Sequence, residues 1–346
     1  MKRVKLGPDG PMVSAICLGT MTWGTQNTEA EGHEQMSHAL DRGVDFWDTA
    51  EMYPTNPVSE ETIGGTEEII GTWFAKTGRR DEVVLATKIG GKGGKARGGE
   101  PITPVSIRKA LDASLKRLKT DRVDLYQFHW PNRGSYHFRQ MWSFDASKQD
   151  RAATLANMED CLGALADLKA EGKVLNWGTS NESAWGMSEW LRLGGESYGP
   201  KPIAVQNEYS LMCRYYDTDL AELGVNEKIT LLAYSPLATG LLTGKYRGDA
   251  TPAGSRRSRT PDLGGRIGPR AFAAADAYVD LARVNGLDPA QMAIAWTLSR
   301  PFPIVPIIGA TSMEQLDCVL GAADLVLAPE LLTAIDRIHR SHPLPF

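Results

Sequence analysis

The sequence lacks several features by which whole classes of protein are recognised. It has only four cysteines in 346 residues, and none of them forms a C-x-x-C pair: Cys17, Cys161, Cys213 and Cys318. This sparse spacing argues against a disulfide framework and against a cysteine-based zinc site, and it favours reduced thiols. No stretch approaches the ~18 uninterrupted apolar residues of a membrane span. We therefore expect a cytoplasmic protein with neither a metal nor a membrane partner.

An excess of basic charge is also missing. Lysine and arginine total 38 and aspartate and glutamate total 42, so the net charge is −4 at pH 7. Nucleic acids and anionic membranes are bound through concentrated basic side chains, and the chain has no such block. The first ten residues begin basic but contain Gly7, Pro8 and Asp9 where a secretion signal needs an apolar run. We expect no nucleic-acid partner and no secretion signal.

Short apolar runs alternate with segments of helical period along the whole chain. Eight runs are predicted as strands: residues 15–18, 44–47, 83–86, 123–128, 175–178, 203–205, 229–233 and 304–308. Between them, apolar residues recur at helical spacing, as at Ile107, Leu111, Leu115 and Leu118. Strands that alternate with helices pair in parallel, and eight such units favour a closed (β/α)8 TIM barrel. The alternative is a doubly wound sheet, but residues 19–24 do not match its G-x-G-x-x-G fingerprint.

The remaining segments are assigned around this barrel. We predict a single domain over residues 1–346, with an N-terminal hairpin at 1–15 that turns at residues 7–10, and a C-terminal helix and tail at 329–346. Residues 131–151 and 247–270 exceed the usual loop length and show no periodicity. Loops of this length in a compact barrel are more often functional than accidental, so both are predicted to be lid-like.

Four side chains suited to proton transfer follow neighbouring predicted strands. Asp48 and Tyr53 follow the second strand, Lys88 the third and His129 the fourth. The carboxyl ends of barrel strands share one rim, where barrel active sites lie. A phenol has a pKa of about 10, and a nearby ammonium favours its phenolate, while a carboxylate keeps that ammonium charged. The group is therefore suited to giving a proton to a carbonyl oxygen that becomes an alkoxide.

These residues resemble a known family. The segments 48–53, 86–88 and 127–130 are similar to the catalytic segments of the aldo-keto reductases, which are (β/α)8 enzymes with a nicotinamide cofactor. Residues 19–24, 178–182, 206–211 and 234–237 support the likeness, which covers nearly the whole chain. It is nearest to the bacterial Tas-like proteins, beside the potassium-channel β-subunit and aflatoxin aldehyde reductase branches.

The resemblance implies a role for each catalytic candidate and an NADP(H) cofactor. Tyr53 would be the general acid, Lys88 and Asp48 would tune it, and His129 would orient a small carbonyl substrate. The carboxamide of the cofactor would meet amide and hydroxyl groups, its ring would stack on Tyr234, and its 2′-phosphate would meet Arg256. The implied cofactor contacts are Gly19, Thr20, Met21, Asp48, Ser180, Asn181, Gln206, Tyr234, Ser235, Leu237, Gly240, Lys245, Arg256, Gly309, Thr311, Ser312 and Gln315.

Further side chains near the predicted rim have weaker signals. Trp23, Met52 and Trp130 follow strands and are predicted to wall an apolar substrate pocket, with core packing as the alternative. Glycine-rich residues 90–95 lack the full phosphate-loop pattern and are interpreted as a flexible loop. The other arginines of the second long loop are interpreted as solvated surface residues: Arg257, Arg259, Arg266 and Arg270. Cys318 and Val319 depart from the family pattern at the adenine end.

Three functions compete at this point. The leading hypothesis is an NADPH-dependent reductase that converts aldehydes or ketones to alcohols with Tyr53 as the acid. A second enzymatic hypothesis is a Schiff-base aldolase at Lys88. A third is a cofactor-binding regulatory subunit resembling the channel β-subunits. The sequence leaves the physiological substrate and the oligomeric state open.

Overall fold

Eight parallel strands close into a barrel in the computed structural model, which describes residues 1–195 and 198–346. The strands are hydrogen-bonded in the order β10-β3-β4-β5-β6-β7-β8-β9. Their bounds are β3 Cys17–Gly19, β4 Phe46–Asp48, β5 Val84–Ile89, β6 Val123–Phe128, β7 Val174–Ser180, β8 Ala204–Glu208, β9 Thr230–Tyr234 and β10 Ile304–Ile308. Each of the eight predicted strands overlaps one of these, so the prediction of a (β/α)8 barrel is confirmed.

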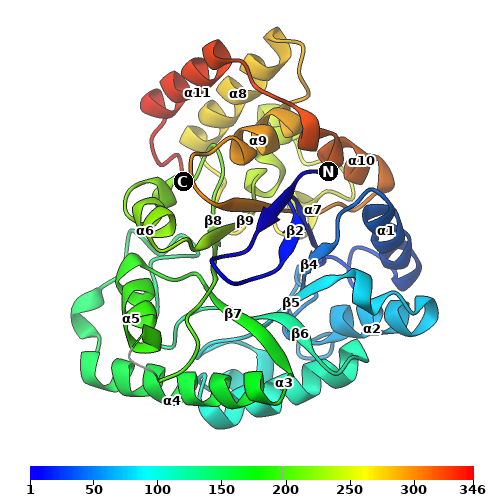
Figure 1. Ribbon diagram of the computed structural model, residues 1–346. Coiled ribbons are helices and arrows are strands. Elements are labelled where there is room, and N and C mark those ends of the chain that lie inside the picture. Colours follow the sequence, from blue (N-terminus) through cyan, green and yellow to red (C-terminus); the bar gives the residue numbers. More distant parts are fainter. Residues whose placement is uncertain (196–197) are drawn as a thin grey trace.

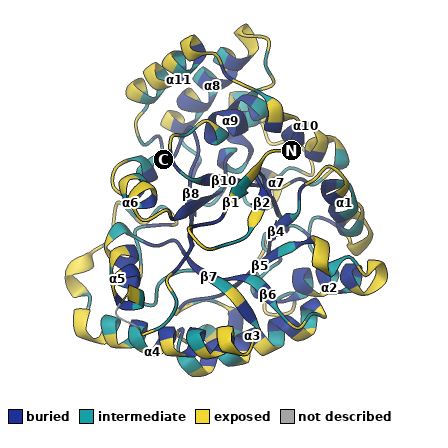
Figure 2. Cartoon of the chain, in the orientation of Figure 1, coloured by how far each residue is buried: buried dark blue, intermediate teal, exposed yellow. Residues whose placement is uncertain are grey.

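Helices surround the barrel as a ring (Figure 1). Their bounds are α1 Glu29–Asp41, α2 Gly65–Thr77, α3 Pro104–Leu118, α4 Arg151–Ala170, α5 Ala184–Gly195, α6 Leu220–Asn226, α7 Arg256–Arg259, α8 Pro269–Val284, α9 Pro289–Leu298, α10 Met313–Leu320 and α11 Pro329–Ser341. Figure 2 shows buried strands in the middle and helices whose outer faces are exposed. The ring therefore covers the apolar outer surface of the parallel sheet.

Local sequence signals explain where these helices begin and which face they bury. Thr103 caps α3 by accepting a hydrogen bond from the Ser106 amide, and Pro104 occupies its first turn. The predicted stripe of Ile107, Leu111, Leu115 and Leu118 is buried against the barrel. Asp150 caps α4 in the same way, so the first long loop ends where that helix begins.

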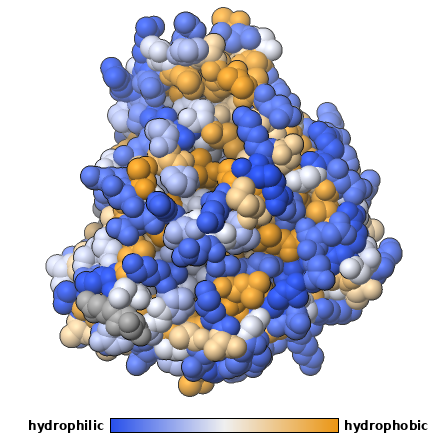
Figure 3. Space-filling model, viewed as in Figure 1, coloured by the Kyte–Doolittle hydropathy of each residue, from blue (hydrophilic) through white to orange (hydrophobic). Residues whose placement is uncertain are grey.

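A hairpin closes the amino end of the barrel. Strands β1 Arg3–Lys5 and β2 Met12–Ser14 pair antiparallel, as predicted, and Leu6 and Val13 join the side chains inside the barrel. The Gly7 amide donates to Thr230 Oγ1 at 2.9 Å, at the start of β9. Figure 1 shows this hairpin across the near end, and Figure 3 shows the same face with mixed hydrophilic and apolar side chains. The carboxyl ends of the strands therefore open on the opposite face.

The two long loops contain short helical turns and end at the first residues of α4 and α8. A 3-10 turn, Ala146–Lys148, lies in residues 131–151, while another, Arg247–Asp249, and the one-turn helix α7 lie in residues 247–270. Among the residues the structure describes, no single helix is long and apolar enough to cross a membrane, although the bent pair Met313–Asp324 and Pro329–Ser341 meets the length and composition test together.

The interpretation of four loop arginines as solvated is wrong for two of them. Arg257 is 9% exposed and donates to the Ala250 carbonyl at 2.9 Å. Arg266 is 4% exposed and binds Glu208 at the end of β8. Glu208 lies 58 positions before Arg266, and Ala250 lies seven positions before Arg257 in a loop without periodicity, so no local pattern predicted either contact. Arg259 and Arg270 are exposed as expected.

Two helical glycines give a test of this packing. In α2, a Cβ at Gly71 would overlap the backbone of α3, including the Leu118 carbonyl carbon at 2.9 Å. Gly163 lies on the exposed face of α4 with nothing within 4 Å. We predict that Gly71→Ala lowers the unfolding free energy by about 1–3 kcal/mol through overpacking. Gly163→Ala should raise it by about 0.5–1 kcal/mol through helix propensity.

Denaturant unfolding of the two variants beside the parent measures both effects. Effects of the same sign at both positions would contradict this account of the contact between α2 and α3.

Candidate active site

The four catalytic candidates come together at the carboxyl ends of β4, β5 and β6. Asp48 is the last residue of β4, Tyr53 lies in the following loop, Lys88 is in β5, and His129 directly follows β6. The Lys88 Nζ lies 2.6 Å from Asp48 Oδ2 and 3.4 Å from the Tyr53 hydroxyl oxygen. The Tyr53 and His129 rings meet edge-on, with centroids 5.9 Å apart. All four predicted residues therefore share one site.

A fully buried ion pair lies at the centre of this site. Lys88 is 0% exposed and Asp48 2%. The ammonium also donates to the Thr49 carbonyl at 2.8 Å, and the second carboxylate oxygen of Asp48 accepts hydrogen bonds from Gln127 and Gln206. Burial lowers the pKa of Lys88, but Asp48 and Tyr53 outweigh it and hold the pKa above its usual value. Lys88 is therefore charged at neutral pH.

Tyr53 and His129 stay neutral beside this charge. Burial raises the pKa of the Tyr53 phenol, while the Lys88 ammonium opposes that rise. Burial and then the Lys88 charge hold the pKa of His129 well below its usual value. The buried Nδ1 of His129 has no hydrogen-bond partner among the described residues. The site thus presents a protonated phenol and an uncharged imidazole next to a fixed positive charge.

An amide cluster lies beside this group, at the ends of β7, β8 and β9. Asn181 donates to the His129 carbonyl at 2.9 Å and to Ser180 Oγ at 3.1 Å, and its oxygen accepts from the Tyr234 hydroxyl at 2.7 Å. Gln206 Nε2 donates to Asp48 and Gln127, and its Oε1 accepts no hydrogen bond from a described residue. The cluster fixes the amide orientations and leaves a carbonyl oxygen available to a ligand.

Basic side chains follow β9, on the side of the second long loop. Burial, with the charges of Arg266 and Arg139, lowers the pKa of Arg256 to about 10. The buried Arg256 Nε and Ser255 Oγ have no partner within the described part of the chain. Burial and the Arg256 charge lower the pKa of Lys245. An uncompensated pair of cations with an orphaned donor is an arrangement suited to a polyanion.

The predicted contacts near β10 and β3 surround the N-terminus of α10. Ser312 caps this helix, and its Oγ accepts from the Gln315 amide at 3.3 Å. The Thr311 amide and hydroxyl both donate to Gln315 Oε1 at 3.1 Å. The space beside Gly309 is open: the nearest atom to a Cβ built there would be the Gly19 carbonyl oxygen, at 3.9 Å. Thr20 is buried and its hydroxyl donates to the Asp48 carbonyl, and Met21 is half-buried.

Backbone strain marks the segments after β7 and β9. Asn181, Ser235, Ala238 and Thr239 all have a φ between 47° and 57°, the left-handed region that side chains with a Cβ avoid. Gly240, at φ 98°, lies where a Cβ would meet Lys245 Cε at 2.9 Å. Leu237 is half-buried and precedes this turn. Such backbone costs of order 1–3 kcal/mol at each residue and is concentrated at functional sites.

The three predicted walls of a substrate pocket differ in their placement. Trp23 is fully buried, belongs to the apolar core and donates to Gln35 in α1 at 3.0 Å, so it does not line an open pocket. The turn after β3 directs it toward the helices instead of the rim. Met52 and Trp130 are half-buried beside Tyr53 and His129.

The glycine-rich loop after β5 is the support of Trp130. The indole nitrogen donates to the Lys92 carbonyl at 3.1 Å. A Cβ at Gly94 would lie 2.7 Å from the ring, and one at Gly91 would overlap the Trp130 backbone. The glycines therefore allow a close approach to a tryptophan and do not form a phosphate loop.

Sequence reasoning missed two polar residues of the site. Gln127 lies in β6 and His129, two positions later, directly follows that strand. The alternation of side chains along a strand therefore places both on one face, and this signal was available. Glu51 is 3% exposed and accepts from the Gly90 amide at 2.7 Å and from Arg97 at 3.1 Å. Nothing local to Glu51 indicates Arg97, which lies 46 residues away.

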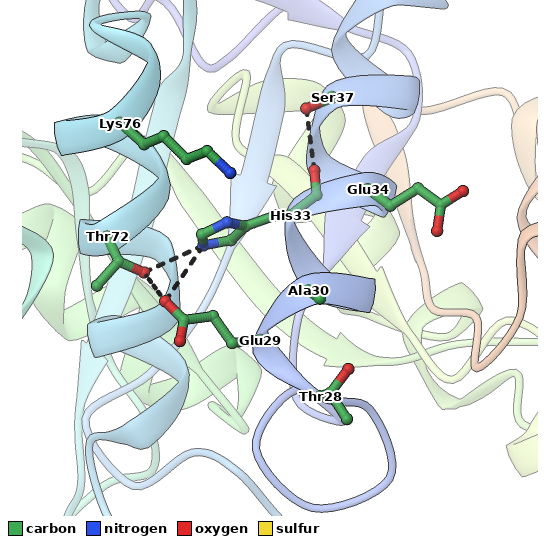
Figure 4. Close-up of a pocket in the computed structure, with 8 residues that line it drawn as sticks. All are labelled: Thr28, Glu29, Ala30, His33, Glu34, Ser37, Thr72 and Lys76. Carbon is green, nitrogen blue, oxygen red and sulfur yellow. Dashed lines mark hydrogen bonds and ion pairs between the residues drawn. The ribbon is translucent and has the colours of Figure 1, made fainter.

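A shallow hollow on the outer surface lies away from this site. It is formed by α1 and α2, and Figure 4 shows His33 turned toward Thr72 and Glu29 across it, below Lys76. His33 Nε2 is 3.0 Å from Thr72 Oγ1 and 3.6 Å from Glu29 Oε1. These contacts join two helices of the outer ring, and none of the catalytic candidates reaches them.

The fold and this rim together define the class of protein. A family model described as "Aldo/keto reductase family" matches residues 15–340. The chain therefore belongs to that family of oxidoreductases.

Three relatives illustrate its range. Protein tas of Escherichia coli is 40% identical over 340 residues, which cover 96% of each chain. The aldo-keto reductase yakc [NADP(+)] of Schizosaccharomyces pombe is 31% identical, over 94% of this chain and 87% of its own. A probable voltage-gated potassium channel subunit beta of Arabidopsis thaliana is 32% identical, over 99% and 98%.

The depressed pKa of His129 gives a prediction about stability. The unfolded chain takes up a proton at this residue as the pH falls below about 6.5, while the folded chain does not. The free energy of unfolding is therefore unaffected by the titration of His129 above that pH. As the pH falls below it, the free energy of unfolding decreases by about 1.4 kcal/mol per pH unit until the pKa of His129 in the folded state is reached. We predict that His129→Asn flattens the dependence of unfolding free energy on pH between about 6.5 and 5.

Urea unfolding at several pH values measures this slope. His137, whose pKa burial also lowers, keeps its own contribution in both proteins and is the internal reference. An identical slope in parent and variant would show that His129 is not held neutral.

Proposed function

We propose that this protein is an NADPH-dependent reductase that converts a small aldehyde or ketone to an alcohol. The observation that carries this proposal is the Lys88 ammonium, held 2.6 Å from Asp48 and 3.4 Å from the Tyr53 hydroxyl in a buried site. A relative named as an NADP(+) aldo-keto reductase supports the choice of cofactor. Membership of the Aldo/keto reductase family supports the class of reaction.

The donor set fits such a cofactor at both ends. Phosphates need cations and free donors, and Lys245, the orphaned Nε of Arg256 and the N-terminus of α10 supply them. A carboxamide needs an acceptor and a donor, and Gln206 Oε1 with the Ser180 and Asn181 group offers matching chemistry. Tyr234 would lie against the ring. NADPH, when bound, supplies the hydride.

Tyr53 is the proton donor in this proposal. Its hydroxyl gives a proton to the carbonyl oxygen as negative charge develops there, and the phenolate left behind is stabilised by Lys88. Asp48 keeps Lys88 protonated, since an unpaired ammonium in this buried position would lose its proton. The phenolate then takes a proton from solvent and the site is restored.

His129 orients the substrate in this proposal. Because its pKa lies well below the usual value, it has one ring N–H to donate and adds no second positive charge. A charged imidazolium here would repel Lys88. A neutral donor opposite Tyr53 fixes the carbonyl oxygen between the two rings, whose centroids are 5.9 Å apart.

The two alternative functions are less well supported. A Schiff-base lysine must be unprotonated to attack a carbonyl, but Asp48, Tyr53 and the Thr49 carbonyl occupy the donors of Lys88 and raise its pKa. Borohydride trapping of a substrate on Lys88 would revive the aldolase. The likeness to a channel subunit named in one relative supports a regulatory role, but binding alone does not require the proton donor, the ammonium and the imidazole together.

We predict that Tyr53→Phe lowers kcat about 10²–10⁴-fold with an aldehyde and NADPH, because the phenyl ring has no proton to give. NADPH binding, followed by its fluorescence, should change less than about threefold, because the lost group acts on the substrate. Tyr216→Phe is the matched control: its buried hydroxyl has no partner among described residues, and it lies outside the site. Equal turnover by Tyr53→Phe and parent would refute the role of Tyr53.

We predict that Arg256→Leu raises the Kd for NADPH about 10- to 100-fold and barely changes that for NADH, since a lost charged hydrogen bond costs about 1.5–3 kcal/mol. The measurement is a titration of each variant with both cofactors. Arg259→Leu, on the exposed face of the same short helix, is the control and should keep the parent's preference. A parallel loss for both cofactors would remove Arg256 from the 2′-phosphate.

A further inference from the structure

One carboxylate at the end of β8 binds both long loops. Glu208 is 6% exposed and lies two residues after Gln206. Its Oε2 accepts from Arg139 of the first loop at 2.9 Å, and its Oε1 accepts from Arg266 of the second loop at 2.8 Å. The two arginines are 127 positions apart, counted from 139 to 266. We name residues 131–151 the first lid and residues 247–270 the second lid.

The lids also touch each other directly. The Arg139 side chain passes over Gly264 and Gly265 of the second lid, where a Cβ would lie 3.6 and 3.5 Å from it. Both glycines have a positive φ, at 66° and 82°. At the outer edge, the guanidinium of Arg270, the last residue of the second lid, lies 6.0 Å from the ring centroid of Trp142 in the first lid. The two lids are therefore in contact both beside Glu208 and at the outer edge.

The charges make Glu208 the critical member of this contact. Arg139 and Arg266 repel each other, and burial together with the Arg266 charge lowers the pKa of Arg139. Arg266 also lowers the pKa of Arg256, which belongs to the second lid. Only a carboxylate between the two guanidinium groups makes their close approach favourable, and removing it leaves buried cations without their partner.

We propose that Glu208 is a positioning residue that couples the two lids, so that neither opens without weakening the hold on the other. The second lid carries Arg256, so this proposal rests on the proposed function where it concerns the cofactor. A substrate that closes the first lid then also holds the second lid down, and the cofactor is retained until the product leaves. The coupling itself is a property of the protein without ligand.

The first experiment needs no cofactor. Hydrogen exchange of peptides from both lids is compared in the parent and in Arg139→Ala, which changes only the first lid. We expect exchange in residues 247–270 to rise about fivefold or more, the size of a weak energetic coupling between sites. Arg266→Ala should have the reciprocal effect on residues 131–151.

A matched control is available in the first lid. Arg133 pairs with the buried Glu182 after β7, and one of the two contacts is 3.1 Å long. Among the described residues, Arg133 has no hydrogen bond or ion pair with the second lid. Glu182→Gln should raise exchange in residues 131–151 alone. Unchanged exchange of the second lid in Arg139→Ala overturns the coupling, as does exchange of both lids in the parent at the rate of unstructured peptide.

The second experiment follows NADPH release by stopped-flow fluorescence. Glu208→Gln should release NADPH about fivefold or more faster than the parent, and Glu182→Gln should stay within about twofold. If the parent protein binds no NADPH, the proposed function is refuted, and the coupling of the lids is judged from hydrogen exchange alone. Unchanged release in Glu208→Gln with normal NADPH binding would overturn the cofactor part of this proposal.

Discussion

The buried pairing of Lys88 with Asp48 is the interaction on which the site depends. An ammonium with no exposed surface stays charged only when its donors are satisfied and a carboxylate lies beside it. The same carboxylate accepts from Gln127 and Gln206, so four strands of the barrel, β4, β5, β6 and β8, converge on one oxygen pair. The barrel closure fixes this convergence, and the electrostatics of Tyr53 and His129 follow from it.

The two ends of the barrel differ in the side chains that they enclose. At the amino end the hairpin adds Leu6 and Val13 to an apolar interior, and its backbone bonds to strand starts. At the carboxyl end the interior becomes polar, and non-glycine residues such as Asn181 and Ser235 adopt left-handed backbone. That strain persists because the rigid strands below determine where the loops begin. The rim can therefore hold a costly geometry without loss of the fold.

Periodicity predicted the strands, the main helices and the shared rim, because those signals lie within a few residues of one another. The catalytic candidates could be predicted for the same reason: each lies at the end of a strand or in the loop that follows it. Arg266 could not, since its burial depends on Glu208, which lies 58 positions earlier, and solvated arginine is the commoner case. The prediction that Trp23 lines a substrate pocket failed, because its position after β3 does not indicate to which side its ring turns.

Three buried glutamates near strand ends each form an ion pair with an arginine of a loop. Glu51 binds Arg97, Glu182 binds Arg133, and Glu208 binds Arg139 and Arg266, each arginine lying in a loop. A buried ion pair adds little net stability over an apolar contact, but its directional hydrogen bonds admit one geometry. Apolar packing would let these loops slide over the strands. Because these loops include the support of Trp130 and also Arg256, the three glutamates fix the position of the loops around Tyr53.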